Sequence, residues 1–346
     1  MRCASCAHPL EGRYVHAGGS AFHLECFTCA QCGSRLSRFL VHGGRFFCER
    51  CHAERFAPRC GVCQRPIAGK FFKHEGQTIH EACYLKHVAE KCAICDGGLS
   101  GRIMLDAWGH KFHESHLRQF PPCDSCGRCT APEIGGGGAH LGDGRISCTG
   151  CLATAVRRES DAKTRYDAIR RQMATWGIVV AEQIPLKLVG RKELAARLSK
   201  VGHPMRKGTY GFTHMETHYE VDGSRLLPRH EITDQNACIF ILHSLPAELF
   251  DGAVAHEIGH AWAFLSGCPR HQPQLAEGSC NYFRWRLHEE RGTPEALAHM
   301  KTMLEDRDPA YGQGFRRVKK YVERNGFAAL LELLRRSSDF PLFSFI

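Results

Sequence analysis

The chain has 346 residues, which is enough for two or three domains and a sizeable core. No apolar run approaches the roughly 18 residues of a membrane span, and the start of the sequence lacks the apolar core of a signal peptide. These features argue against an integral membrane protein. We therefore expect a soluble, cytoplasmic protein with no membrane partner.

The formal net charge of +10 raises the question of nucleic-acid binding. However, 17 of the 20 Cys precede residue 152, mostly as C-x-x-C pairs interleaved with His, a pattern typical of thiolates on zinc rather than of disulfides. Residues 1–151 contain 18 Lys and Arg and 13 Asp and Glu, and sixteen thiolates on five Zn²⁺ would change this balance from +5 to −1. Because tight phosphate binding needs clustered positive charge, we expect no nucleic-acid partner.

The first half of the chain repeats one spacing of zinc ligands five times. Each repeat has a C-x-x-C pair and, after a longer gap, a second pair of ligands with two residues between them. Four protein ligands leave no open position, so these sites are predicted to be structural. In every repeat a Gly lies four residues before the third ligand, which predicts a hairpin that delivers that ligand. The five ligand sets are Cys3, Cys6, His23 and Cys26; Cys29, Cys32, Cys48 and Cys51; Cys60, Cys63, His80 and Cys83; Cys92, Cys95, His113 and His116; and Cys123, Cys126, Cys148 and Cys151.

The first two ligand sets resemble a LIM domain, including the two-residue step between Cys26 and Cys29. Longer steps separate the later sets, which are therefore interpreted as LIM-like modules. We expect a LIM domain with two zinc sites over residues 1–54 and LIM-like modules with three zinc half-sites over residues 55–151. Closed zinc modules of this kind more often bind proteins than perform chemistry.

The fifth ligand set can be drawn in two ways. Cys126 could form its C-x-x-C pair with Cys129 instead of Cys123. That arrangement leaves Cys123 without a role. We prefer the set that contains Cys123 and interpret Cys129 as a spare cysteine.

Residues 152–176 contain no Pro or Gly and place apolar residues on one helical face, which predicts a helical linker. The remaining residues, 177–346, are predicted to form a domain of mixed strands and helices. The whole protein is therefore assigned to the α+β class, as an array of zinc modules followed by an α+β domain. The predicted strands are 178–180, 184–189 and 237–242, and the predicted helices include 191–198, 295–306, 315–324 and 327–336.

The motif His256-Glu257-x-x-His260 is the strongest catalytic signal in the sequence. Pro246 and Gly267 bracket a predicted helix of about 20 residues around it, on which both imidazoles leave one face and can bind one metal. Glu257 lies beside them, where it can act as a general base. Because the chain has 22 His, the motif alone could arise by chance, so the assignment depends on the helix and on a third ligand.

Glu277 is the candidate third ligand. It lies in the first turn of a helix predicted over residues 274–290, far enough beyond His260 for the chain to double back. Asn281, one turn later, could orient one of the ligands. The alternative is that Glu277 is a surface residue stabilised by the helix dipole.

The sequence resembles the DA-one family of plant LIM-domain peptidases, which are ubiquitin-activated regulators of organ size. The resemblance rests on the zinc modules, on His256-Glu257-x-x-His260-Ala261-Trp262 and on Glu277-Gly278-x-Cys280. The plant members carry N-terminal ubiquitin-interacting helices, whereas this sequence starts at its first zinc ligand, and their zinc array has four half-sites rather than five. We therefore expect a prokaryotic or stand-alone relative. Further matching segments are 184–189, 241–246, 308–316 and 339–341.

The resemblance implies that residues 177–346 form a gluzincin-type metallopeptidase domain, an endopeptidase that cuts protein substrates, with the catalytic zinc on His256, His260 and Glu277. It also raises ubiquitin or a ubiquitin-like protein as a partner. With the five structural sites, the chain is expected to bind six zinc ions.

The predicted mechanism is zinc-dependent peptide hydrolysis, in which Glu257 takes a proton from a zinc-activated water. Residues 237–243 are expected to form an exposed edge strand to which an extended substrate adds. Tyr311 and His271 are the candidates for stabilising the oxyanion, although Tyr311 could simply pack in its Gly-rich turn. The zinc modules would recruit substrate or regulate the active site. The alternative is a LIM-type scaffold with an inert peptidase fold.

Overall fold

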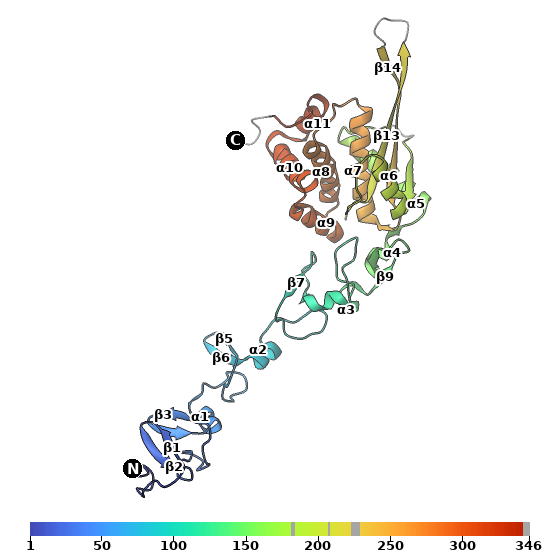
Figure 1. Cartoon of the computed structure of the whole chain (residues 1–346). Helices are drawn as coiled ribbons and strands as arrows, with labels where there is room; N and C mark the ends of the chain where they lie inside the picture. The colour runs from blue at the N-terminus through green and yellow to red at the C-terminus, as the bar shows by residue number, and fades with distance from the viewer. Residues whose placement is uncertain (181–183, 207, 223–228, 342–346) are drawn as a thin grey trace. The chain divides into compact units, whose positions relative to one another are not determined.

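The chain divides into two compact units, Met1–Ile103 and Met104–Ile346 (Figure 1). The division falls within the predicted LIM-like segment 55–151, so the fifth zinc module shares a unit with the C-terminal domain. Among the described residues, no helix is both long enough and apolar enough to cross a membrane. The computed structural model describes residues 1–180, 184–206, 208–222 and 229–341.

Each zinc module contains the predicted hairpin, and its Gly lies at the turn. The five glycines have φ between 73° and 89°, a left-handed conformation that other residues rarely adopt. The hairpins are β1 (Tyr14–Ala17) with β2 (Ser20–His23), β3 (Leu40–His42) with β4 (Arg45–Phe47), β5 (Phe71–His74) with β6 (Gln77–His80), β7 (Ile103–Leu105) with β8 (Lys111–His113), and β9 (Gly138–His140) with β10 (Ile146–Cys148). Short helices accompany them: α1 (Glu49–Phe56), α2 (Glu81–His87), η1 (Glu114–Arg118), α3 (Pro132–Gly135) and α4 (Thr149–Ala153).

A second feature, which the sequence did not predict, also repeats in all five modules. The residue four positions after the first Cys has a positive φ, although only two of the five are Gly. An isolated antiparallel bridge closes the same turn, from the residue before the first Cys to the residue six after it. The five modules therefore share one local fold. The positive-φ residues are Ala7, Gly33, Gln64, Asp96 and Gly127.

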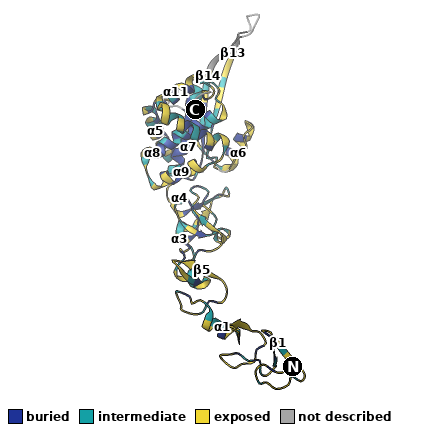
Figure 2. Ribbon diagram, turned by 90° about the vertical axis from the view of Figure 1, so that its left-hand side faces the viewer, coloured by how far each residue is buried: buried dark blue, intermediate teal, exposed yellow. Residues whose placement is uncertain are grey.

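The large core of the protein lies in the C-terminal unit, between a three-stranded sheet and its helices (Figure 2). The strand order is β12 (Leu186–Val189), β14 (Arg229–Leu242) and β13 (Gly211–Asp222). β12 pairs with β14 in parallel, and β13 pairs with β14 antiparallel. This mixture of helices and strands confirms the α+β assignment.

Two predictions about strands are wrong. Residues 237–243 were expected at an exposed edge, but β14 is the central strand of the described sheet and Ile239 and Ile241 are fully buried. The apolar run that marks this strand reflects burial on both faces, which is typical of a central strand. Residues 178–180 form no strand. The side chains of Ile178 and Val180 are buried in the core, but the backbone of this segment does not pair with another strand. Part of the following segment, 181–183, lies outside the described residues.

The helix predicted as a linker is α5 (Glu159–Thr175), and it ends just before Gly177, whose φ is +89°. Its apolar face is fully buried in the main core of the C-terminal unit. The helix is therefore part of the C-terminal domain. The buried side chains are Ala162, Tyr166, Ile169 and Met173.

The remaining helices cover the sheet and build the site. The motif helix and the following helix lie side by side, and the motif helix also contacts β13 and β14 (Figure 1). Nearly every residue of the motif helix up to Trp262 is buried, which explains its apolar composition. The helices are α6 (Arg191–Lys200), α7 (Ala247–Leu265), α8 (Pro273–Arg291), α9 (Pro294–Glu305), the π-helical turn η2 (Pro309–Gln313), α10 (Gly314–Asn325) and α11 (Phe327–Arg336).

Candidate metal centre

Two glycines allow α8 to approach its neighbours closely. A Cβ on Gly259 of α7 would lie 2.8 Å from the Phe283 ring and 2.9 Å from Cys280 Sγ, both on α8. A Cβ on Gly278 of α8 would lie 2.4 Å from the backbone of Gly314. Any side chain at these positions would force the helices apart, so the close approach depends on Gly. It brings the N-terminal half of α8, including Glu277, against the HExxH face of α7.

The side chains of His256, His260 and Glu277 converge at this contact. The two Nε2 atoms are 3.2 Å apart, and Glu277 Oε2 lies 3.2 Å from that of His256 and 3.5 Å from that of His260. A tetrahedral zinc with bonds of 2.0–2.2 Å requires ligand separations of about 3.3–3.5 Å. Glu277 Oε2 is buried and has no hydrogen-bond partner. The three atoms are therefore spaced as the ligands of one zinc ion would be, whereas no hydrogen bond to Glu277 Oε2 accounts for their convergence.

Glu277 is present as a carboxylate. Burial alone would raise the pKa of Glu277, but the adjacent imidazoles of His260 and His256 lower it far below its ordinary range. A buried anion between two ring nitrogens is the donor set expected for a divalent cation.

Asn281 orients His256. Its Oδ1 accepts a hydrogen bond from His256 Nδ1 at 3.0 Å, and its amide nitrogen donates to the Tyr311 carbonyl at 3.1 Å. Because Nδ1 carries the proton for this bond, Nε2 keeps its lone pair for a metal. Asn281 thus connects one candidate metal ligand of α7 to the π-helical turn η2.

The Glu257 side chain contacts the sheet and is only 6% exposed. The Thr213 hydroxyl lies 2.7 Å from its Oε2 and donates to the carboxylate. A Cβ on Gly211 would lie 2.8 Å from both Cγ and Oε1 of Glu257. The start of β13 therefore fixes the position of this carboxylate. Sequence reasoning missed Thr213 and Gly211, since they precede Glu257 by more than 40 residues and belong to no local motif.

Tyr311 lies at the site, whereas His271 lies beside it. The Tyr311 ring is nearly parallel to the His256 ring, with centroids 6.2 Å apart. Burial and the carboxylates of Glu277 and Glu257 raise the pKa of Tyr311, so its phenol keeps its proton and can donate. His271 Nε2 instead donates to the Leu334 carbonyl at 2.8 Å, which leaves only Nδ1 for another partner.

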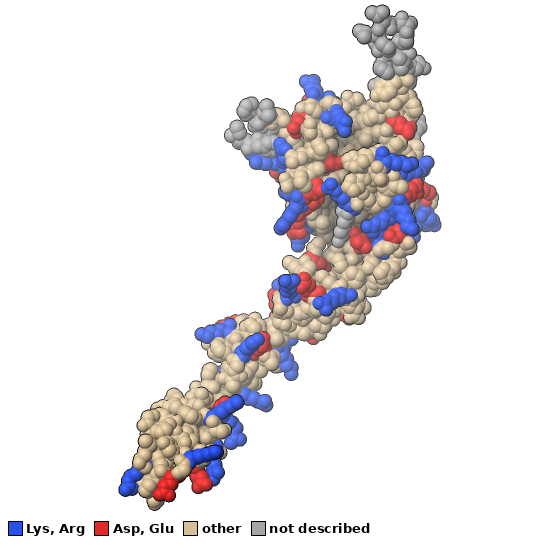
Figure 3. All heavy atoms as spheres, viewed as in Figure 1, with Lys and Arg blue, Asp and Glu red and all other residues tan. Residues whose placement is uncertain are grey.

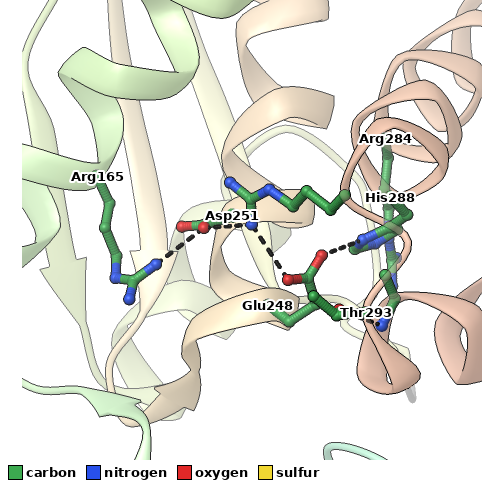
Figure 4. A network of polar contacts seen from close by, with 8 residues as sticks. Arg165, Glu248, Asp251, Arg284, His288 and Thr293 are labelled. Atoms are coloured by element: carbon green, nitrogen blue, oxygen red, sulfur yellow. Dashed lines mark hydrogen bonds and ion pairs between the residues drawn. The ribbon is translucent and has the colours of Figure 1, made fainter.

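A buried charge network holds the first turns of α7 in place (Figure 4). Asp251, 2% exposed, accepts from Arg165 of α5 at 2.9 Å and from Arg291 of α8 at 2.6 Å. Glu248 accepts from His288 Nδ1 at 2.7 Å. Burial alone would raise the pKa of Glu248, but His288 and Arg291 lower it below its ordinary value. The network fixes the orientation of α7, since a buried charge that lost its partner would be costly.

The five ligand sets predicted for structural zinc are each brought together, with the four ligand atoms within 4.8 Å of one another. Cys126 Sγ and Cys148 Sγ are 3.7 Å apart, close to the roughly 3.8 Å separation of two thiolates on one zinc. His23 and His80 turn Nδ1 toward a cysteine at 3.4 Å and donate from Nε2 to a proline carbonyl at 3.0 Å. These clusters are consistent with zinc binding.

Cys129 stands outside the fifth ligand set. It is 1% exposed, and its thiol donates to the Phe120 carbonyl at 3.3 Å. No disulfide links any of the 20 cysteines, all of which lie in the described residues.

Comparison with known proteins places a LIM domain at residues 3–56 and a DA1-like domain, described as Protein DA1, at residues 161–300. Protein DA1-related 1 and Protein DA1, both of Arabidopsis thaliana, are each 26% identical to this chain over 98% of its length. The chain spans 66% and 68% of the lengths of these two relatives. The mouse PDZ and LIM domain protein 7 is 40% identical over 70 residues, 20% of this chain and 15% of that protein.

Fold and site thus define a LIM-domain protein whose C-terminal unit carries an HExxH motif on a largely buried helix. More particularly, the chain combines a LIM domain with a DA1-like domain, and proteins of the Arabidopsis DA1 family resemble it over nearly its whole length. The resemblance stated from the sequence is confirmed.

Proposed function

We propose that this protein is a zinc-dependent endopeptidase. The observation that carries the proposal is the convergence of His256, His260 and Glu277 within 3.5 Å of one another, next to the buried carboxylate of Glu257. Three ligands and one open position define a catalytic rather than a structural zinc site. A zinc ion held there would supply Lewis acidity toward a water molecule and the scissile carbonyl.

The chain's own residues would handle the protons. Glu257, held by Thr213, accepts a proton from the attacking water and delivers it to the leaving amine. Its position between the sheet and the ligands suits both steps, because substrate and water meet on that side of α7. The protonated phenol of Tyr311 is the proposed donor to the developing oxyanion.

The proposed substrates are proteins bound as extended segments. β13 lies at the end of the described sheet, and its first residues contact Glu257. A peptide that adds along this edge would make main-chain hydrogen bonds while its scissile bond faces the ligands. β13 therefore replaces residues 237–243 as the proposed substrate strand. The zinc modules preceding this domain would recruit the protein substrates.

The test is a comparison of wild type with Glu257→Gln on a proteome-derived peptide library. The variant should lose about 10²–10⁴-fold in kcat, because the amide cannot take up a proton, and should keep the zinc content of wild type. Cleavage by both proteins at equal rates would contradict the peptidase proposal. Absence of cleavage by wild type with all six sites loaded would favour an inert LIM-type scaffold.

A further inference from the structure

The fifth zinc module is joined to the DA1-like domain by direct contacts. Both belong to the unit Met104–Ile346, and the contacts meet at the segment that leads from β14 into α7. This segment contains the two-residue strand β15 (Leu245–Pro246). After α4, which carries the fourth ligand of the module, β11 (Ala155–Val156) pairs antiparallel with β15. Val156 and Leu245 are 3% and 0% exposed, so the pairing is part of the main core.

The segment that follows the module also accepts a hydrogen bond from the first N–H group of the motif helix. The N–H of Ala247, the first residue of α7, donates to the Thr154 carbonyl at 3.0 Å. The residue before it, Pro246, offers no capping side chain. The first N–H groups of a helix have no partner within the helix, so this carbonyl takes the place of an N-cap. The Ser244 N–H donates to the Val156 carbonyl at 2.7 Å and holds the preceding turn.

A buried arginine makes the third link. Arg145, 5% exposed, forms an ion pair with Asp143 inside the module and donates from Nη2 to the His243 carbonyl at 2.7 Å. The donor and its acceptor lie on opposite sides of the contact between the module and the DA1-like domain. Arg145 is held in place by its own module, since Asp143 lies on the same hairpin turn.

The fifth ligand set also differs from the other four in its burial. Three of its four cysteines are buried, whereas the other sets have at most two buried ligands. The Cys148 N–H donates to Cys123 Sγ at 3.3 Å, as is usual for a thiolate on a structural zinc. This set is therefore built as part of a folded domain rather than as an exposed binding module.

We propose that Cys123, Cys126, Cys148 and Cys151 bind a zinc ion that belongs to the DA1-like domain and positions the N-terminal end of α7. The set fixes α4 and the start of β11, and these fix β15 and the first turn of α7. His256 follows Ala247 by nine residues, about 14 Å along the helix. A shift of the first turn would therefore move the HExxH ligands as a rigid body. The inference rests on the proposed peptidase function only because it treats the centre formed by His256, His260 and Glu277 as catalytic.

The test uses the full-length protein and two measurements that do not require peptide cleavage. Zinc per chain is measured by elemental mass spectrometry, and amide hydrogen exchange is followed over residues 245–252. Cys151→Ser is compared with Cys63→Ser, which removes a ligand from the third set. Each variant should lose one zinc per chain. Only Cys151→Ser should speed exchange over residues 245–252, by about tenfold, as for the loss of a helix cap.

A zinc content unchanged by Cys151→Ser, or exchange equal to that of Cys63→Ser, would overturn the proposal. If Cys151→Ser does not fold, the double variant Asp143→Asn/Arg145→Met decides, because it breaks the link to His243 without touching a ligand or leaving a buried charge unpaired. It should keep the wild-type zinc content and show faster exchange over residues 245–252. Unchanged exchange in this variant would contradict the positioning role. Failure of the peptidase proposal would alter neither readout.

Discussion

At the scale of single residues, the candidate centre depends on side chains outside the proposed set of metal ligands. Asn281 holds the Nδ1 side of His256, and Thr213 holds the carboxylate of Glu257. Neither belongs to the HExxH motif. Each restricts a group that would otherwise sample several rotamers, and such partners typically govern metal affinity and activity.

Asn281→Ala is expected to weaken catalytic zinc binding by about ten- to a hundredfold, because His256 loses the acceptor that fixes its ring. Zinc affinity is measured by competition with a chelator that spares the closed sites. Asn281→Asp retains an acceptor at this position and should restore most of the affinity. Equal affinities for the alanine variant and wild type would show that His256 needs no such partner.

Thr213→Val is expected to lower kcat by about tenfold, since a hydrogen bond to a charged group is worth roughly 1.5–3 kcal/mol and part of this is recovered by relaxation. Zinc content should not change. The matched control is Thr217→Val on the same strand, which does not contact Glu257 among the described hydrogen bonds. A kcat that falls equally in both variants would point to a general effect on β13.

At the scale of elements, the centre is assembled by the close contact of α7 and α8. The contact requires Gly259, whose missing side chain leaves room for Phe283 and Cys280. The position of Glu277 depends on this spacing, because it is carried by α8 while both histidines are carried by α7. Helix spacing therefore sets the separation of the ligands.

Gly259→Ala should reduce catalytic zinc affinity and destabilise the fold by about 1–3 kcal/mol, the usual effect of an added methyl group in a packed core. Chelator competition and urea unfolding measure the two effects. Gly142→Ala is the control, since a Cβ there meets no atom within 4 Å. Zinc affinity equal to wild type in Gly259→Ala would mean that α8 can shift without moving Glu277.

At the scale of the whole molecule, charged side chains mix at the surface, whereas titratable side chains in the interior lie close to one another. On the face of the C-terminal unit shown in Figure 3, Lys and Arg are interspersed with Asp and Glu. Inside, His288 and His299 are buried with nearly parallel rings, 5.5 Å apart, near Arg284 and Glu248. Burial, followed by Arg284 and His288, lowers the pKa of His299 to about 3.

This predicts a specific loss of stability in acid. Because the folded-state pKa of His299 lies below the unfolded value of 6.5, its contribution is present above pH 6.5 and is lost as pH falls toward 3. Between about pH 7.5 and 5.5 the loss is about 1 kcal/mol. His299→Gln should lose that much less stability over this interval, measured by urea unfolding at saturating zinc, whereas the exposed-site variant His140→Gln should follow wild type. A variant with the full wild-type pH dependence would exclude His299 as the source.

The sequence by itself determined the local features. Ligand spacing identified the five zinc modules, and HExxH between Pro246 and Gly267 placed α7, because metal-ligand and helix signals lie within a few residues of each other. Glu277 could be proposed because it lies near the start of the next helix.

Only the tertiary structure decided which strand is the edge and that α5 belongs to the core. It also decided that Thr213 and Gly211 contact Glu257, and that Arg145 contacts the segment leading into α7. The physical reason is separation along the chain. An apolar run shows that a strand is buried but not which strands flank it. A hydrogen bond between residues 44 or 98 positions apart leaves no periodicity in the sequence.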